Sequence, residues 1–127
     1  MYGIDPLYHL PEGASDHHGG IRVLAVPANL DVYEAPKLRE AAIATIARGR
    51  YRIVVDLAGL AYIDSTGMGV LVGMKKRTEA HGGWVRLARV PEDIGRQFGM
   101  VGLHKVFVIA DTVEGAINYE TEGAETA

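Results

Sequence analysis

The spacing of apolar residues changes along the chain between the period of a strand and the period of a helix. Short runs of aliphatic and β-branched residues predict strands at 21–26, 51–57, 84–90 and 105–110. Apolar residues at intervals of three and four predict helices between and after them, at about 31–48, 66–81, 91–100 and 112–120. Strands separated by helices favour right-handed crossovers and therefore a mostly parallel sheet.

The run at 51–57 is continuously apolar up to its aspartate, which is typical of a strand buried on both faces of a parallel sheet. Polar residues and glycines mark the helix ends. Asp31 and Glu34 have capping-box spacing, Gly49 ends the first helix, and Asp111 with Glu114 is expected to cap the last. The predicted fold class is α/β, a small mixed and mostly parallel β-sheet packed with about four α-helices.

The chain divides into one folded unit and two flanking segments. Residues 1–20 hold two Pro and four Gly and are expected to be an irregular extension, with a short edge strand suggested at 7–10. Residues 21–120 are expected to form the domain, and 121–127 a flexible polar tail. The sequence shows no internal repeat and no second domain.

Composition narrows the classes of partner. A chain of 127 residues with 48% hydrophobic residues is large enough for one buried core. The net charge is -3 and no basic run exceeds Lys75-Lys76-Arg77, so no nucleic acid is expected as a direct partner. With no Cys, no apolar run of about 18 residues and no secretory signal, we expect a cytoplasmic protein without membrane contact.

The stretch AYIDSTGMGVLVGM, residues 61–74, carries the main candidate for chemistry. Asp64, Ser65 and Thr66 stand directly before a helical pattern, and each of these residue types is a preferred helix N-cap. One helix uses one cap residue, so at least one hydroxyl is surplus. Ser65 is therefore either part of the cap or a group on which another molecule acts.

A helical wheel at 100° per residue divides this helix into two faces. The face predicted to lie against the sheet is formed by Gly67, Val70, Leu71 and Met74. The opposite stripe is formed by Ser65, Met68, Gly69, Val72 and Lys76. This stripe is expected to be exposed although Met68 and Val72 are apolar, so either a loop or neighbouring helix covers it or it is a partner-binding surface.

Enzymatic interpretations of Ser65 fail on spacing. A nucleophile elbow needs a glycine two residues before the serine, and Ile63 stands there. No His lies in a recognisable catalytic motif, and Thr66 interrupts an aspartic-protease tripeptide. His17 and His18 beside Asp16 are not expected to hold a metal, since adjacent His residues in a Gly-rich segment rarely share an ion. Neither catalysis nor a cofactor is expected.

Asp56 is a rival candidate because ligands gather at the carboxyl ends of strands in α/β sheets. It stands where a response-regulator receiver has its phosphate acceptor, but the acidic pair and late Lys that a receiver needs are missing. Asp56 is instead expected to converge with Asp31 and Asp64 near Ser65. Three carboxylates there would form an acidic partner-binding surface together with Thr66 and the stripe.

Three segments together resemble the anti-sigma factor antagonists of the STAS-domain family. They are VVDLAGLAYIDSTGMGVLVGMKKRTEAHGG at 54–83, NLDVYEAPKLRE before it, and VPEDIGRQFGMVGLHKVFVIADTVEGAI after it. The resemblance covers about residues 21–119, and its most specific part is Asp-Ser-Thr-Gly-Met-Gly-Val-Leu after a strand ending in Val-Asp-Leu. It implies a single STAS-like domain with the sheet and helices predicted above.

The resemblance also implies a function. In that family the first hydroxyl of the Asp-Ser-(Ser or Thr)-Gly motif is phosphorylated by an anti-sigma factor serine kinase, and a metal-dependent serine phosphatase reverses the reaction. By position the acceptor is Ser65, with Thr66 as the second candidate. The unphosphorylated form would bind the kinase and free its sigma factor. The alternative is a non-phosphorylated scaffold or sensor module in a stress-signalling assembly; in either case a monomer or weak dimer is expected.

Overall fold

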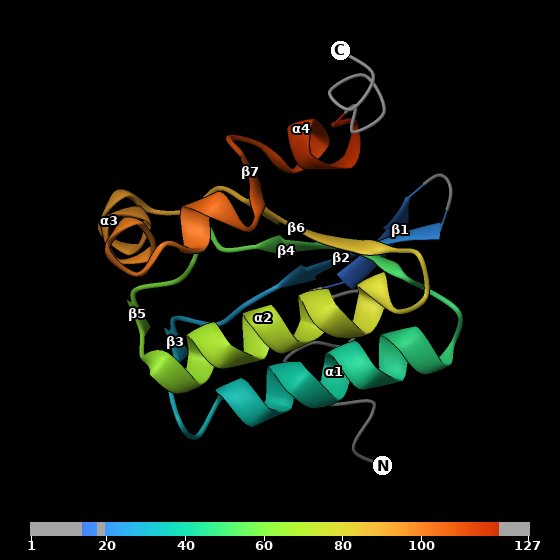
Figure 1. The fold of residues 1–127 in the computed structure, drawn as a ribbon, viewed down its shortest axis with the longest axis horizontal. Coiled ribbons are helices and arrows are strands. Elements are labelled where there is room, and N and C mark those ends of the chain that lie inside the picture. The colour runs from blue at the N-terminus through green and yellow to red at the C-terminus, as the bar shows by residue number, and fades with distance from the viewer. Residues whose placement is uncertain (1–13, 18–19, 120–127) are drawn as a thin grey trace.

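The computed structural model describes residues 14–17 and 20–119. Its main sheet has five strands in the order β1-β2-β4-β6-β7, as Figure 1 shows. The strands are β1 (Ala14–His17), β2 (Ile21–Ala25), β4 (Arg52–Asp56), β6 (Trp84–Ala88) and β7 (Val108–Ala110). All neighbours are parallel except β1 and β2, so the sheet is mixed and mostly parallel as predicted.

The N-terminal segment contributes the edge strand β1, which pairs antiparallel with β2 from Ala14 opposite Leu24 to His17 opposite Ile21. The strand suggested at 7–10 lies outside the described residues. Each later strand of the main sheet, β4, β6 and β7, is reached through a crossover that contains a helix.

Helices cover both faces of the sheet. They are α1 (Ala35–Ala47), α2 (Ser65–Glu79), α3 (Glu92–Val101) and α4 (Val113–Ile117), with a 3-10 turn at Leu103–Lys105. In Figure 1, α1 and α2 lie side by side under one face and α4 lies over the other. No helix within the described ranges is both long and apolar enough to cross a bilayer.

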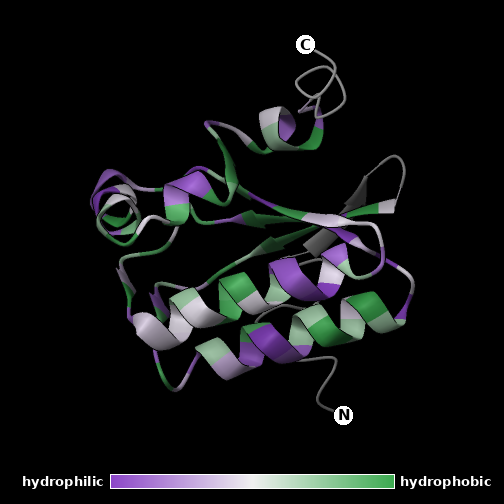
Figure 2. Ribbon diagram, viewed as in Figure 1, coloured by the Kyte–Doolittle hydropathy of each residue, from purple (hydrophilic) through white to green (hydrophobic). Residues whose placement is uncertain are grey.

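The central strand β4 explains the continuous apolar run at 51–57. Ile53 and Val55 are fully buried in the larger core cluster, which includes residues of α1 and α2. Val54, on the opposite face, is fully buried in a second cluster with Ile117 of α4. Successive side chains point to opposite faces of a strand, so a sheet covered on both sides needs apolar residues at every position. Figure 2 shows β4 coloured as hydrophobic along much of its length.

Several predicted boundaries shift. The first helix, expected from about residue 31, begins at Ala35, and its N-cap residue Glu34 makes no side-chain capping bond. Pro91 is the extended N-cap residue of α3, so that helix begins at Glu92. The strand expected at 105–110 is shortened to Val108–Ala110, because the 3-10 turn occupies its start. The last helix is capped by Thr112, whose Oγ1 accepts from Gly115 N at 2.8 Å, and not by Asp111.

A second, two-stranded sheet was not predicted. It pairs β3 (Asn29–Leu30) in parallel with β5 (Tyr62–Ile63), with Leu30 opposite Ile63. Asp31 follows β3 and Asp64 follows β5, so both aspartates lie at the same end of this small parallel sheet. The pairing thereby places the turn that leads into α1 beside the N-terminus of α2.

Candidate functional site

The N-terminus of α2 is capped by Asp64 alone. Asp64 has extended backbone angles, and its Oδ1 accepts a hydrogen bond from Gly67 N at 3.0 Å. Ser65 is then the first residue of the helix, and both Ser65 and Thr66 are exposed. The surplus of hydroxyls expected from the sequence is confirmed, because the side chain that caps the helix is a carboxylate.

Gly67 fixes this helix end to the small sheet. A Cβ on Gly67 would lie 2.4 Å from the backbone oxygen of Leu30 and 2.8 Å from Cγ1 of Ile63. No side chain fits in that space, so glycine permits the helix to approach β3 and β5 this closely. Ser65 lies in the same first turn of α2 as Gly67, so the contact of Gly67 with β3 and β5 also fixes the position of Ser65.

The stripe predicted on α2 is exposed only in part. Ser65, Gly69 and Lys76 are exposed, but Met68 and Val72 are half-buried and pack against the larger core cluster. The expectation that all five are exposed is wrong for these two, because core residues cover part of the stripe that the wheel places opposite the buried face. The apolar patch inferred from them is smaller than predicted.

Beside the stripe lies a hollow of about 320 Å³ between α1 and α2. Its floor includes Gly69 and Gly73, where an added Cβ would meet nothing within 4 Å. Arg39 of α1 and Arg77 of α2 also line it, together with Thr66. The exposed side of α2 is therefore a shallow surface with cationic side chains, bounded at one end by the hydroxyls of Ser65 and Thr66.

Asp31 shapes the other side of the site. Its Oδ1 accepts from the backbone N–H of Tyr33 at 3.0 Å and of Glu34 at 2.9 Å. These bonds hold a turn whose tip exposes Val32 and Tyr33, at 55% and 79%. Tyr62 of β5 is 52% exposed.

Sequence reasoning missed Val32, Tyr33 and Tyr62, although all three lie in the strands and turn that adjoin α2. Large apolar or aromatic side chains exposed in one region of a protein mark an interaction surface. We refer to the exposed members of this region as the Ser65 surface, formed by Val32, Tyr33, Tyr62, Ser65, Thr66 and Gly69.

Asp56 has a structural role in its own part of the fold. Its Oδ1 accepts from Arg89 Nε at 3.1 Å and its Oδ2 accepts from Arg89 Nη2 at 2.7 Å, while Ala58 N also donates to Oδ1. The Asp56 side chain is 11% exposed. The carboxylate raises the pKa of Arg89 by hydrogen bonding and by its charge. The ion pair neutralises Asp56, so the expected convergence of three aspartates reduces to Asp31 and Asp64.

His81, the nearest histidine in sequence, lies beyond the far end of α2 and stacks on Tyr51 with ring centroids 4.4 Å apart. Asp64 is occupied as the cap. An exposed hydroxyl at a helix N-terminus is suited to be modified by another protein, since the free N–H groups there favour a phosphate.

Comparison with known proteins agrees with the fold. The STAS domain family model matches residues 14–116. The anti-sigma-B factor antagonist of Bacillus subtilis is 34% identical over 92 residues, which cover 72% of this chain and 84% of the relative. The anti-sigma F factor antagonist of Paenibacillus polymyxa is 29% identical over 103 residues, 80% of this chain and 88% of that protein.

Solved structures show the same fold. A putative anti-sigma factor antagonist from Thermotoga maritima superposes with a TM-score of 0.78 at 20% identity, covering 92% of this chain and 96% of its own. SpoIIAA is similar in its unphosphorylated form, with a TM-score of 0.72 at 23% identity over 83% of this chain and 91% of SpoIIAA. The phosphorylated form of SpoIIAA, from Bacillus, superposes with a TM-score of 0.66 at 23% identity, covering 83% of this chain and 95% of SpoIIAA. The chain therefore belongs to the STAS-domain family, in which its relatives are named anti-sigma factor antagonists.

Proposed function

We propose that this protein is an anti-sigma factor antagonist whose Ser65 is the phosphate acceptor. In the unphosphorylated form the Ser65 surface binds a cognate anti-sigma factor serine kinase and thereby frees a sigma factor. The observation that carries this proposal is the exposed Ser65 directly after Asp64, which makes the capping bond itself. The forms named for SpoIIAA, phosphorylated and unphosphorylated, support a switch of this kind.

The fold is expected to tolerate the modification. A phosphate on Ser65 would lie at the positive end of the α2 dipole, which favours an anion by about 0.3 to 1 kcal/mol. Asp64 would keep its bond to Gly67 N, because that bond does not involve the Ser65 hydroxyl. Phosphorylation would thus leave the core nearly unchanged, and a metal-dependent serine phosphatase could restore the original surface.

Binding of the kinase to the Ser65 surface is expected to weaken strongly when Ser65 carries a phosphate. A phosphoserine carries a charge of about -2 at neutral pH. Asp31 and Asp64 adjoin Ser65, so phosphate would make the centre of the Ser65 surface strongly anionic, next to Tyr33 and Tyr62. If the kinase presents apolar or acidic groups there, desolvating and repelling this charge costs about 3 kcal/mol, which weakens binding by more than about 100-fold.

Phosphate mapping tests the acceptor. The purified protein is incubated with ATP and each anti-sigma factor-type serine kinase of its own genome, and the modified residue is located by mass spectrometry. We expect one phosphate on Ser65, retained in Thr66→Ala and lost in Ser65→Ala. Thr66→Ala is the matched control, because Thr66 is the adjacent exposed hydroxyl in the same helical turn.

Other outcomes identify other functions. Loss of label in Thr66→Ala but not in Ser65→Ala would move the acceptor to Thr66. Absence of label with every such kinase would contradict the proposal and favour the scaffold or sensor module. An alkali-labile phosphate on Asp56 would indicate a receiver-like activity, which the Arg89 ion pair opposes.

A further inference from the structure

The two edges of the main sheet differ in composition. One edge is formed by β1, with the sequence Ala-Ser-Asp-His, and the other by β7, with the sequence Val-Ile-Ala. Within the described residues no further strand pairs with the outer side of β7. Proteins commonly keep a sheet edge from pairing with other chains by placing charged residues on it or by covering it. Because β7 contains no charged residue, its composition does not prevent such pairing.

The backbone of Ile109, the middle residue of β7, is directed to the outer edge. Ala110 O accepts from Arg89 N at 3.0 Å, so the backbone groups of Ala110 point toward β6 and its continuation. Backbone groups of successive residues point to opposite sides of a strand, and those of Ile109 therefore point away from β6. The Ile109 side chain is 39% exposed, although Leu87, its partner in β6, is fully buried. Solvent thus reaches this edge.

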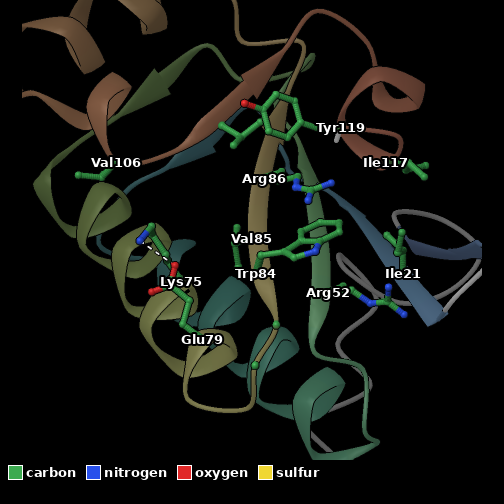
Figure 3. A pocket seen from close by; sticks show the side chains of 13 residues that line it. Ile21, Arg52, Lys75, Glu79, Trp84, Val85, Arg86, Val106, Ile117 and Tyr119 are labelled. Carbon is green, nitrogen blue, oxygen red and sulfur yellow. Dashed lines mark ion pairs between the residues drawn. The ribbon is translucent and has the colours of Figure 1, made fainter. Parts of the chain in front are cut away.

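Exposed apolar side chains surround the edge. Met100 and Val101 lie at the end of α3 and Val106 directly follows the 3-10 turn, and all three are exposed. The turn contacts both α3 and β7, and Figure 1 shows α3 and the turn beside the start of β7. Val106 also lines a cavity of about 680 Å³, where Figure 3 shows it well apart from Tyr119. We refer to Met100, Val101, Val106 and Ile109 as the β7 patch.

Two opposite charges flank β7. Lys105 stands three residues before the strand and Asp111 directly after it, and both are exposed. Within residues 14–17 and 20–119 neither side chain forms an ion pair. When two copies of one strand pair antiparallel, the end of each lies beside the start of the other. Such pairing brings Asp111 of each copy toward Lys105 of the other, so the flanking charges of this edge are complementary to themselves.

We propose that β7 pairs antiparallel with β7 of a second copy of this chain, about a twofold axis at Ile109. The outward N–H and C=O of Ile109 bond to the same groups of the other copy, and the two sheets become continuous. The β7 patches of both copies then meet, and Lys105 and Asp111 pair at each end. Each copy uses the same surface, so the assembly closes as a dimer and does not grow into a fibre.

Sedimentation velocity over a range of protein concentrations tests the interface. Ile109→Lys places a charge at the centre of the edge, and we expect dimerisation to weaken by at least about tenfold. Val32→Lys is the matched control, because it replaces an exposed aliphatic side chain outside the β7 patch and should dimerise like the unchanged protein. Urea unfolding confirms that each variant is folded.

A charge exchange tests the antiparallel arrangement. Lys105→Glu or Asp111→Lys alone brings like charges together at both ends of the paired strands, and each should weaken dimerisation by roughly three- to tenfold in low salt. The double variant Lys105→Glu, Asp111→Lys restores opposite charges and should dimerise like the unchanged protein. Both single effects should shrink in high salt, since salt screens exposed charges.

Three results would overturn the proposal. The first is a sedimentation coefficient that does not change with concentration up to about 500 μM. The second is equal dimerisation of Ile109→Lys and the unchanged protein, or loss of the dimer in Val32→Lys instead. The third is a double charge variant as weak as the single ones. The unmodified protein is measured without a kinase, so none of these results depends on the function proposed for Ser65.

Discussion

The buried side of α2 at its N-terminus is closely packed, whereas the exposed side of the same turns is open. At Gly67 an added Cβ would lie 2.4 Å from the oxygen of Leu30, while at Gly69, two residues later, it would meet nothing within 4 Å. Ser65 and Thr66 belong to the open side. Atoms added to one side displace the core, and atoms added to the other remain in solvent.

Under the proposed function, this difference would allow a phosphate on Ser65 to be recognised without a change of fold. The packed side holds α2 in place against β3 and β5, so the Ser65 hydroxyl has a fixed position. The open side would leave room for a phosphate and for the proposed partner. Substitutions on the packed side should therefore change the free energy of unfolding. Substitutions or a phosphate on the open side should change the binding of the partner.

The largest effect is expected for Gly67→Ala. The new methyl group would overlap backbone that cannot move without separating α2 from β3, so we expect a loss of about 3 kcal/mol or more in the free energy of unfolding. Gly69→Ala is the matched control and should gain up to about 1 kcal/mol, because Ala favours helix and nothing obstructs it. Urea unfolding measures both. Equal stability of the two variants would contradict the packing described for Gly67.

A smaller loss is expected for Asp56→Asn. The amide keeps the shape of the side chain but removes the charge that binds Arg89 in two places. Because Arg89 is half-exposed and can be hydrated, the melting temperature should fall by only a few degrees, and by less in high salt. Glu92→Gln, which removes a fully exposed partner of Arg96, is the control and should change little. If the loss of melting temperature in Asp56→Asn were the same in high salt, the loss of an ion pair would not be its cause.

The next smaller loss of stability is expected when the N-cap of α2 is removed. Asp64→Ala removes the acceptor of the Gly67 N–H and should cost about 1 kcal/mol of stability. Thr66→Ala, in the exposed first turn, should cost less than about 0.5 kcal/mol. Thermal unfolding compares the two variants. If Thr66→Ala were the more harmful, the cap would belong to a hydroxyl and not to Asp64.

The smallest effect on stability is expected at Ser65 itself. Ser65→Asp places a carboxylate near the positive end of α2, so the free energy of unfolding should change by no more than about 0.5 kcal/mol. Ser65→Ala is the neutral control. Chemical unfolding of the two variants in parallel gives the comparison, and a large drop for Ser65→Asp alone would mean that the open side is packed after all.

Much of the fold follows from residue spacing. The apolar run of β4, the glycine stop after α1 and the position of α2 were predicted, because each depends on local period or on a residue with one strong conformational preference. The small sheet was not predicted, since β3 and β5 have two residues each and show no period. Its consequence, the exposure of Tyr33 and Tyr62 beside Ser65, was missed with it.

The candidate site shows the same limit. The acceptor position of Ser65 could be proposed from the motif and from the surplus of cap residues, both of which are local. The partner of Asp56 could not, because Arg89 is 33 residues away and adopts a φ of 56°, a conformation that its sequence neighbours do not indicate. Met68 and Val72 were assigned to the exposed face because a wheel does not show how far the core extends around the helix.

The central claim is that a phosphate on Ser65 changes binding and leaves the fold intact. Isothermal titration of the cognate kinase with the unmodified protein, and with the same protein carrying one phosphate on Ser65, tests it most directly. The account predicts a Kd at least about 100-fold weaker for the phosphorylated form, equivalent to about 3 kcal/mol. Equal Kd values for the two forms would contradict it.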